Sequence, residues 1–299
     1  MKEDLLKYLR PEVIAGLKSI DLKARLIVEG FISGLHRSPF RGRSVEFADF
    51  RTYNPGDDLK SIDWKVLART DRFYVKEYEE RTNLTAHLLL DASNSMSYGK
   101  RITKYEYASC LAASISYILI KQRDSVGIWL FDNRIRKFLW PSSRESQLQQ
   151  ILQLLGKSNP ASRTNIATTI AEIASKIKRR GLVMIFSDLH YNPEDTIKSI
   201  SLLRTMKNEV VVFLILDPDE RFFPFKTQAR FQDLETKQEI LIDPRLIRKD
   251  YIKRIEKMIG NYQEKFLNQN IDFMSLTTDT PFDEALFRFL EIRKKMWSS

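Results

Sequence analysis

The stretch "HLLLDASNSMSYG", residues 87–99, runs from an apolar segment directly into Asp91, Ser93 and Ser95. A carboxylate at the end of a buried strand is costly unless a cation or hydrogen bonds compensate its charge. The two serines that follow carry hydroxyl oxygens, which can bind a cation together with the carboxylate. This stretch therefore predicts a buried strand that ends at a polar site.

Apolar runs alternate with helical patterns from Leu84 onward. The predicted strands are 84–90, 125–131, 134–140, 182–187, 209–216 and 270–275. The predicted helices are 103–122, 144–156, 166–179, 194–206, 245–268 and 281–295. Nearly unbroken apolar runs such as "LVMIFS" and "VVVFLIL" are typical of buried parallel strands. The alternation predicts an α/β fold with a doubly wound, mostly parallel sheet, and the short link at Asp132-Asn133 predicts one antiparallel edge strand.

The 299 residues have room for more than one domain. We expect an N-terminal helical segment at 1–36, where apolar residues recur at three- and four-residue steps. A small β module is expected at 37–83, around a Pro-Gly turn signal. The α/β domain is expected at 84–299, with a hairpin insertion near 221–241.

Composition excludes several classes of protein. The net charge of +10 is spread along the chain, which favours solubility over a nucleic-acid-binding face. Cys110 is the only cysteine, so an internal disulfide and a cysteine metal cluster are excluded. The N-terminus does not resemble a secretory signal, and the longest uncharged apolar stretch, 109–120, is too short for a membrane span. We therefore expect a cytoplasmic protein without a membrane span.

Three predicted loops place oxygen ligands at one edge of the sheet, because ligands of open α/β sheets bind outside the carboxyl ends of the strands. Mg²⁺ takes about six oxygen ligands, and Mn²⁺ or Ca²⁺ are alternatives for the same donors. Only two of the expected donors are carboxylates, so the ion would attract an acidic residue from a partner. The expected metal ligands are Asp91, Ser93, Ser95, Thr164 and Asp188.

A simpler interpretation remains open for the hydroxyl residues. A serine or threonine before a helix is most often an N-cap, which is worth about 0.5–2 kcal/mol. Ser93, Ser95 and Thr164 could each have only that role. The metal hypothesis depends on all of these residues meeting Asp91 and Asp188.

The whole pattern resembles a von Willebrand factor type A domain over residues 84–280. The stretch from Asp91 to Ser95 matches the metal-ion-dependent adhesion site (MIDAS) of that family, and Thr164 and Asp188 match its second and third loops. Upstream, "EFADFRTYNPGDDLKSIDWKVLART" resembles the signature of Domain of Unknown Function family 58, which precedes such a domain in bacterial proteins.

This resemblance implies a non-enzymatic, metal-dependent protein-interaction module. It also implies a MoxR-type AAA+ ATPase as the partner, with the chain acting as an adaptor in the assembly or maturation of other proteins. In the upstream signature, charged and aromatic residues either dock the small β module or form a partner-facing surface. These residues are Arg51, Asp57, Asp58, Asp63 and Trp64.

An enzyme is the main alternative. The sequence has neither a G-x-S-x-G elbow nor a phosphate-binding G-x-x-x-x-G-K-[ST] loop. A magnesium-dependent phosphatase or phosphotransferase could use Asp91 as its nucleophile. Such enzymes typically carry a second carboxylate two residues further on, where this chain has Ser93. We therefore expect no catalytic activity. His87 alternates within a strand and is expected to be a packed core residue.

Overall fold

The computed structural model describes residues 10–17, 19–35, 51–52, 74–75, 84–161, 166–232 and 238–297. The chain divides into two compact units. One unit joins Met1–Ile32 to Leu84–Ser299, and the other is Ser33–Asn83. The predicted domain boundaries after residues 36 and 83 stay a prediction.

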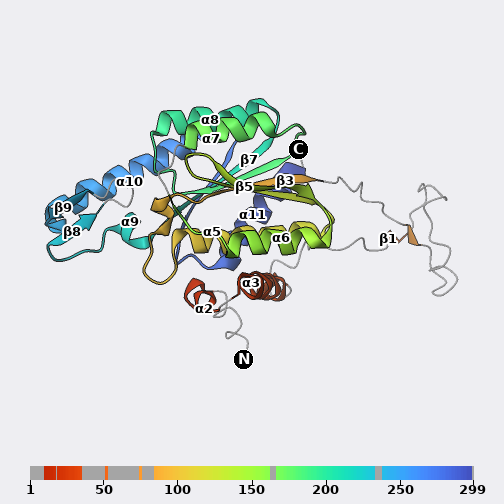
Figure 1. The fold of residues 1–299 in the computed structure, drawn as a ribbon, viewed down its shortest axis with the longest axis horizontal. Helices are drawn as coiled ribbons and strands as arrows, with labels where there is room; N and C mark the ends of the chain where they lie inside the picture. The colour runs from red at the N-terminus through yellow and green to blue at the C-terminus, as the bar shows by residue number, and fades with distance from the viewer. Residues whose placement is uncertain are drawn as a thin grey trace. The chain divides into compact units, whose positions relative to one another are not determined.

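A six-stranded sheet forms the centre of the larger unit (Figure 1). Its strands in spatial order are β10 (Asp272–Thr277), β7 (Glu209–Leu216), β6 (Leu182–Ser187), β3 (Thr85–Asp91), β4 (Ser125–Phe131) and β5 (Ile135–Ser142). Neighbouring strands are parallel, except that β4 and β5 pair antiparallel. The predicted doubly wound, mostly parallel sheet with one antiparallel edge strand is therefore confirmed.

The composition of the central strands explains their position. Every residue of β6 is buried, and so is every residue of β7 after Glu209. Strands that are covered on both faces can be apolar throughout, without the alternation that a half-exposed strand needs. The apolar runs of the sequence therefore mark the centre of the sheet.

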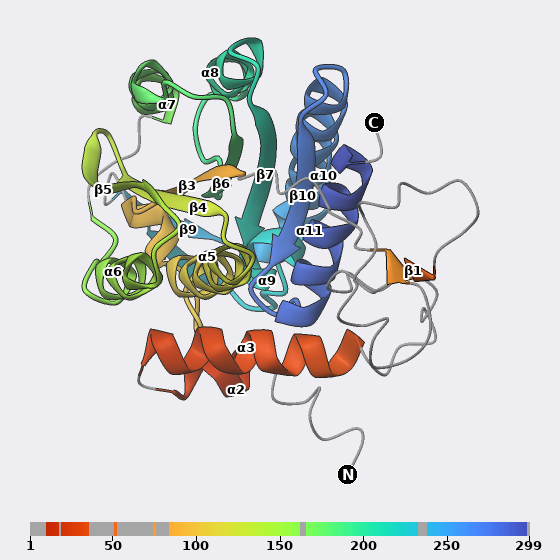
Figure 2. The same ribbon diagram turned by 90° about the vertical axis from the view of Figure 1, so that its right-hand side faces the viewer.

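Helices cover both faces of this sheet (Figure 2). One face packs against α5 (Lys104–Lys121), α6 (Glu145–Gly156) and α11 (Phe282–Trp297). The other face packs against α7 (Ile166–Lys176), α8 (Pro193–Thr205) and α10 (Pro244–Leu267). Within the described residues, no helix combines the length and the apolar character that a membrane span needs.

Two N-terminal helices, α2 (Pro11–Ala15) and α3 (Ile20–Leu35), pack on the α5 side of the domain (Figure 2). Ile14 and Ile27 are buried in the same core as α5. Lys23 of α3 forms an ion pair with Glu106 of α5. The N-terminal helices are therefore part of the larger compact unit.

A hairpin follows the short helix α9 (Pro218–Phe222), which itself follows β7. The two strands of the hairpin, β8 (Ala229–Gln232) and β9 (Glu239–Ile242), pair antiparallel. Phe223 stacks against Phe231 of β8, with ring centroids 5.5 Å apart, and lies 4.4 Å from the ring of Tyr251 in α10. These aromatic contacts fix the hairpin to the start of α10.

Of the smaller unit, the described residues are 33–35, at the end of α3, and two short strands. Strand β1 (Arg51–Thr52) pairs antiparallel with β2 (Tyr74–Val75). Arg51 thus has a described backbone, whereas Asp57, Asp58, Asp63 and Trp64 lie outside the described residues. Their role in docking or partner binding stays a prediction.

His87 is a packed core residue, as expected, because only 3% of it is exposed. The indole Nε1 of Trp129 donates a hydrogen bond to His87 Nδ1 at 3.2 Å. Burial lowers the pKa of His87 to about 4. The imidazole of His87 is therefore neutral in the folded protein at neutral pH.

This lowered pKa predicts a loss of stability in acid. In the unfolded chain the pKa is near 6.5, so between about pH 6.5 and 4 the unfolded state binds the proton and the folded state does not. The stability from His87 is fully present above this window and is lost as the pH falls through it. At about pH 5 the loss is about 2 kcal/mol relative to about pH 7.5.

Urea unfolding at both pH values measures this loss. In His87→Leu the difference between the two pH values should be smaller by about 2 kcal/mol, because the titrating group is gone. Any constant cost of leaving the Trp129 N–H without its acceptor cancels in this comparison. An equal pH dependence in the two proteins would contradict the assignment.

Candidate functional site

The candidate site lies where two central strands send their chains to opposite faces of the sheet. After β3 the chain enters α5 on one face, and after β6 it enters α8 on the other. Strands β3 and β6 are direct neighbours, so their carboxyl ends open a crevice between the two following loops. Asp91 ends β3, and Ser187 ends β6 just before Asp188.

Asp91 is completely buried and is held on both carboxylate oxygens. Its Oδ1 accepts a hydrogen bond from the Ser93 backbone N–H at 2.9 Å. Its Oδ2 accepts one from the Ser187 hydroxyl at 2.6 Å. Burial and the negative charge of Asp188 together raise the pKa of Asp91 to about 7. The hydrogen bonds therefore do not fully compensate the charge of Asp91.

The two serine hydroxyls after Asp91 point at each other. Ser93 Oγ and Ser95 Oγ are 3.0 Å apart and form a buried hydrogen bond. Ser93 stands at the N-cap position of the short 3-10 helix η2 (Asn94–Ser97), but its side chain makes no capping hydrogen bond. The N-cap of α5 is instead Thr103, which accepts a hydrogen bond from the Glu106 N–H at 3.1 Å. Capping therefore does not account for Ser93.

Asp188 lies on the opposite side of the crevice and carries an ion pair. Its Oδ2 accepts a hydrogen bond from Lys104 Nζ at 2.7 Å, and its Oδ1 accepts one from the His190 N–H at 3.1 Å. Burial opposes the ionised form, but the Lys104 ammonium outweighs it and holds the pKa of Asp188 below its usual value. A hydrogen bond from Ser95 acts in the same direction. The structure therefore brings Asp91, Ser93, Ser95 and Asp188 together.

Lys104 is the residue that the sequence interpretation missed. Only 2% of its side chain is exposed, and its ammonium group also pairs with Glu220 Oε1 of α9 at 2.6 Å. Burial lowers the pKa of a lysine, but Asp188 and Glu220 more than offset this and raise the pKa of Lys104. Its only signal in the sequence was its position as the first residue of the helix after the Asp91 loop.

Glu220 connects this ion pair to the loop after β7. Its Oε2 accepts a hydrogen bond from the Asp217 N–H at 2.9 Å, which closes the capping box of α9. Burial raises the pKa of Glu220 above its usual value, against the opposing effect of Lys104. The loops after β3, β6 and β7 thus meet at a single ammonium group.

Thr164, the fifth expected ligand, lies outside the described residues. The nearest described residue before it is Ala161, whose N–H donates to the Ala92 carbonyl at 2.9 Å, directly beside Asp91. Whether Thr164 belongs to the site stays a prediction.

The ligand atoms of the described site residues are of the type that a hard divalent cation binds. Their side chains offer carboxylate and hydroxyl oxygens, which are the ligands that Mg²⁺ prefers. Asp188 and Glu220 both contact the ammonium group of Lys104, and the buried carboxylate of Asp91 is near enough to Asp188 for their charges to repel. The negative charge in excess of Lys104 is what a divalent cation would neutralise. In the described part of the chain, no group of three or more His, Cys, Asp and Glu side chains is arranged to hold a metal. Serine hydroxyls would therefore have to complete the donor set.

The ion pair of Lys104 predicts a large effect on stability. In Lys104→Met, Asp188 and Glu220 lose their cation while the buried carboxylate of Asp188 remains, so the free energy of unfolding should fall by about 3–5 kcal/mol. Lys100→Met is the matched control, because Lys100 pairs with Asp219 in the same region but its side chain is 72% exposed. Urea unfolding should show little change in that variant. Equal losses in the two variants would contradict a special role of the buried ammonium.

Comparisons with known proteins identify the family of the chain. Among solved structures, BatB from Bacteroides thetaiotaomicron is similar over 72% of this chain and 100% of its own, at 15% identity and a TM-score of 0.48. The SpRpn10 VWA domain is similar over 69% of this chain and 94% of its own, at 9% identity and a TM-score of 0.39. The uncharacterized protein Rv1480 of Mycobacterium tuberculosis is 25% identical over 292 residues, which are 95% of this chain and 91% of that protein. The family model "Protein of unknown function DUF58" matches residues 49–258, so the chain belongs to the DUF58 family, as its upstream signature predicted.

Proposed function

We propose that this chain is a non-enzymatic protein-interaction module that depends on a divalent cation. The cation, Mg²⁺ in the first place, would be held by Asp91, Ser93, Ser95, Thr164 and Asp188. When bound, it would supply an open coordination position for an acidic side chain of a partner. The rest of the site would keep the donors fixed and the crevice negatively charged until the cation enters.

One observation carries this proposal. Asp91 and Asp188 are 97 positions apart in the sequence, but their two loops meet in the crevice between the ends of β3 and β6. The Ser187 hydroxyl, at the end of β6, donates to the carboxylate of Asp91, at the end of β3, so the two strand ends are directly bonded. A loop contact with a structural role alone would not need two buried carboxylates that repel each other, because burying them costs stability.

The partner is proposed from the family resemblance. A MoxR-type AAA+ ATPase would present an Asp or Glu to the cation, and the chain would act as an adaptor in the assembly or maturation of other proteins, in the cytoplasm. The site itself supports the acidic character of the partner. With only Asp91 and Asp188 as carboxylate ligands, a bound divalent cation keeps affinity for a further carboxylate.

Metal binding is the first test. Titration of the chelator-treated protein with MgCl₂ in a calorimeter should give about one site per chain. Asp91→Asn and Asp188→Asn should each weaken binding at least about tenfold, because each removes a charged donor. Asp132→Asn is the matched control, since Asp132 is also a buried aspartate and follows the neighbouring strand β4. Equal binding by all four proteins would refute the site.

Partner capture is the second test. The immobilised chain should retain a purified MoxR-type ATPase in Mg²⁺ and release it in EDTA. Asp91→Asn should fail to retain it, whereas Asp132→Asn should behave as the wild type. If neither EDTA nor Asp91→Asn reduces the retention, the interaction does not depend on the cation. Hydrolysis of p-nitrophenyl phosphate that is lost in Asp91→Asn would instead support the phosphatase alternative.

A further inference from the structure

The two edges of the central sheet differ in how they are protected. Strand β5, at one edge, carries Arg136, Lys137 and Pro141, which are residues that discourage a further strand from pairing. Strand β10, at the other edge, has the sequence "DFMSLT" and contains neither lysine nor proline. The β10 edge therefore lacks the usual sequence protection against strand addition.

The main chain of β10 has hydrogen-bonding groups that point away from the sheet. Thr278 donates its N–H to a carbonyl of β7, whereas Thr277 donates its N–H to a side-chain hydroxyl outside the sheet. In a parallel pair, alternate residues bond the same neighbouring strand. Phe273 and Ser275 are in phase with Thr277, so their N–H and C=O groups face away from β7.

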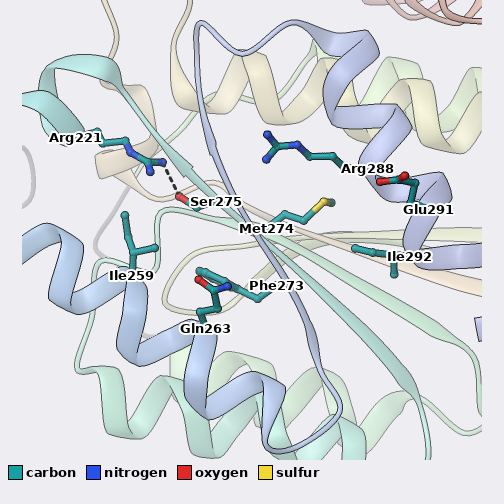
Figure 3. A pocket seen from close by; sticks show the side chains of 9 residues that line it. All are labelled: Arg221, Ile259, Gln263, Phe273, Met274, Ser275, Arg288, Glu291 and Ile292. Carbon is teal, nitrogen blue, oxygen red and sulfur yellow. Dashed lines mark hydrogen bonds between the residues drawn. The ribbon is translucent and has the colours of Figure 1, made fainter. Parts of the chain in front are cut away.

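A groove runs along this edge, with a volume of about 390 Å³ (Figure 3). Its floor is the β10 segment that contains Phe273 and Ser275. Helix α10 contributes Ile259 to one wall and helix α11 contributes Ile292 to the other. Among the described strands, none pairs with the outer edge of β10, and the groove has apolar positions on both sides of it. This is the arrangement by which sheet edges receive an extended peptide.

Two arginines give the groove its chemical selectivity. Arg221 of α9 donates from Nη1 to Ser275 Oγ at 3.0 Å, and among the described residues it has no carboxylate within ion-pair distance. Arg288 of α11 lines the groove, and its ion pair within the described residues is with Glu284 on its own helix surface, where both side chains are about half exposed. Glu291 is the one acidic residue that lines the described groove. Figure 3 shows Arg221 and Arg288 on either side of β10, with Arg221 bonded to Ser275.

We infer that this groove binds an extended, acidic peptide segment of a partner protein, which adds to the sheet as a strand beside β10. The main chain of the peptide pairs with Phe273 and Ser275. Its apolar side chains lie against Ile259 and Ile292. Acidic side chains of the peptide pair with Arg221 on one side of β10 and with Arg288 on the other. This site is separate from the candidate cation site and does not depend on a metal.

Selection from a random peptide library displayed on phage tests this inference. The library is panned against the full chain in EDTA, so that binding through a divalent cation cannot contribute. Enriched sequences should carry Asp or Glu, and labelled synthetic copies should bind the wild type in fluorescence anisotropy. Arg221→Gln and Arg288→Gln should each weaken binding about tenfold or more, because each removes a charge-assisted hydrogen bond.

Matched variants separate the strand edge from its side chains. Arg230→Gln is the control for charge, because Arg230 pairs with Glu239 on the hairpin and does not line the groove. Ser275→Pro removes one outward N–H from the edge, where proline is tolerated. Ser275→Ala keeps that N–H. Binding should be lost in Ser275→Pro and kept in Arg230→Gln. Ser275→Ala, which loses only the hydroxyl that holds Arg221, should weaken binding less than Ser275→Pro.

A second measurement covers the case in which Ser275→Pro does not fold. Copies of the selected peptide that are N-methylated at alternate residues lose their main-chain donors and should no longer bind the wild type. The inference is overturned if no acidic peptide is enriched, or if N-methylated and unmodified peptides bind equally. It is also overturned if the groove is closed by a second copy of the chain, so that the wild type is a dimer and Arg221→Gln or Ser275→Pro is a monomer.

Discussion

The buried ammonium group of Lys104 is the interaction on which the arrangement of the loops depends. An unpaired charge in the protein interior is so costly that Lys104 can be buried only if its carboxylate partners are buried with it. Asp188 and Glu220 come from the loops after β6 and β7, while Lys104 begins the helix after β3. The three loops must therefore close together. An ion pair of this kind adds little net stability over an apolar cluster, but it leaves few other ways for the loops to pack.

The sheet determines where these loops can meet. The chain leaves the parallel neighbours β3 and β6 toward opposite faces of the sheet. This leaves a crevice that no crossover helix fills, and both strands end there in polar residues. The sequence predicted this location well, because apolar runs mark buried strands and Asp91 and Asp188 stand directly at their ends. Ser93 and Ser95 lie in the same loop as Asp91, and their role as ligands stays a prediction. Because apolar runs mark the buried strands and helical periodicity marks the helices, the predicted strands and helices of the α/β domain agree with the observed ones to within a few residues.

The interactions that the sequence did not reveal are long-range and depend on burial. Lys104 and Asp188 are 84 positions apart, and Lys104 and Glu220 are 116 apart. Nothing in a sequence distinguishes a buried lysine from the many exposed ones, because the fold alone decides which carboxylates approach it. Ser187 was assigned to a strand end, but its bond to Asp91 required knowledge that β3 and β6 are neighbours. The β10 groove was missed because it is formed by four elements, α9, α10, β10 and α11, that no local pattern connects.

Helix α9 joins the two sites that we describe. It spans only Pro218–Phe222, yet its consecutive residues Glu220 and Arg221 contact different parts of the molecule. Glu220 binds Lys104 at the crevice, and Arg221 binds Ser275 at the edge strand. Successive residues of a helix point about 100° apart, so one short helix can serve both contacts. A rigid segment of this length cannot turn or shift without changing both hydrogen bonds at once. The capping box that fixes its start is therefore as important to the β10 groove as it is to the cation site.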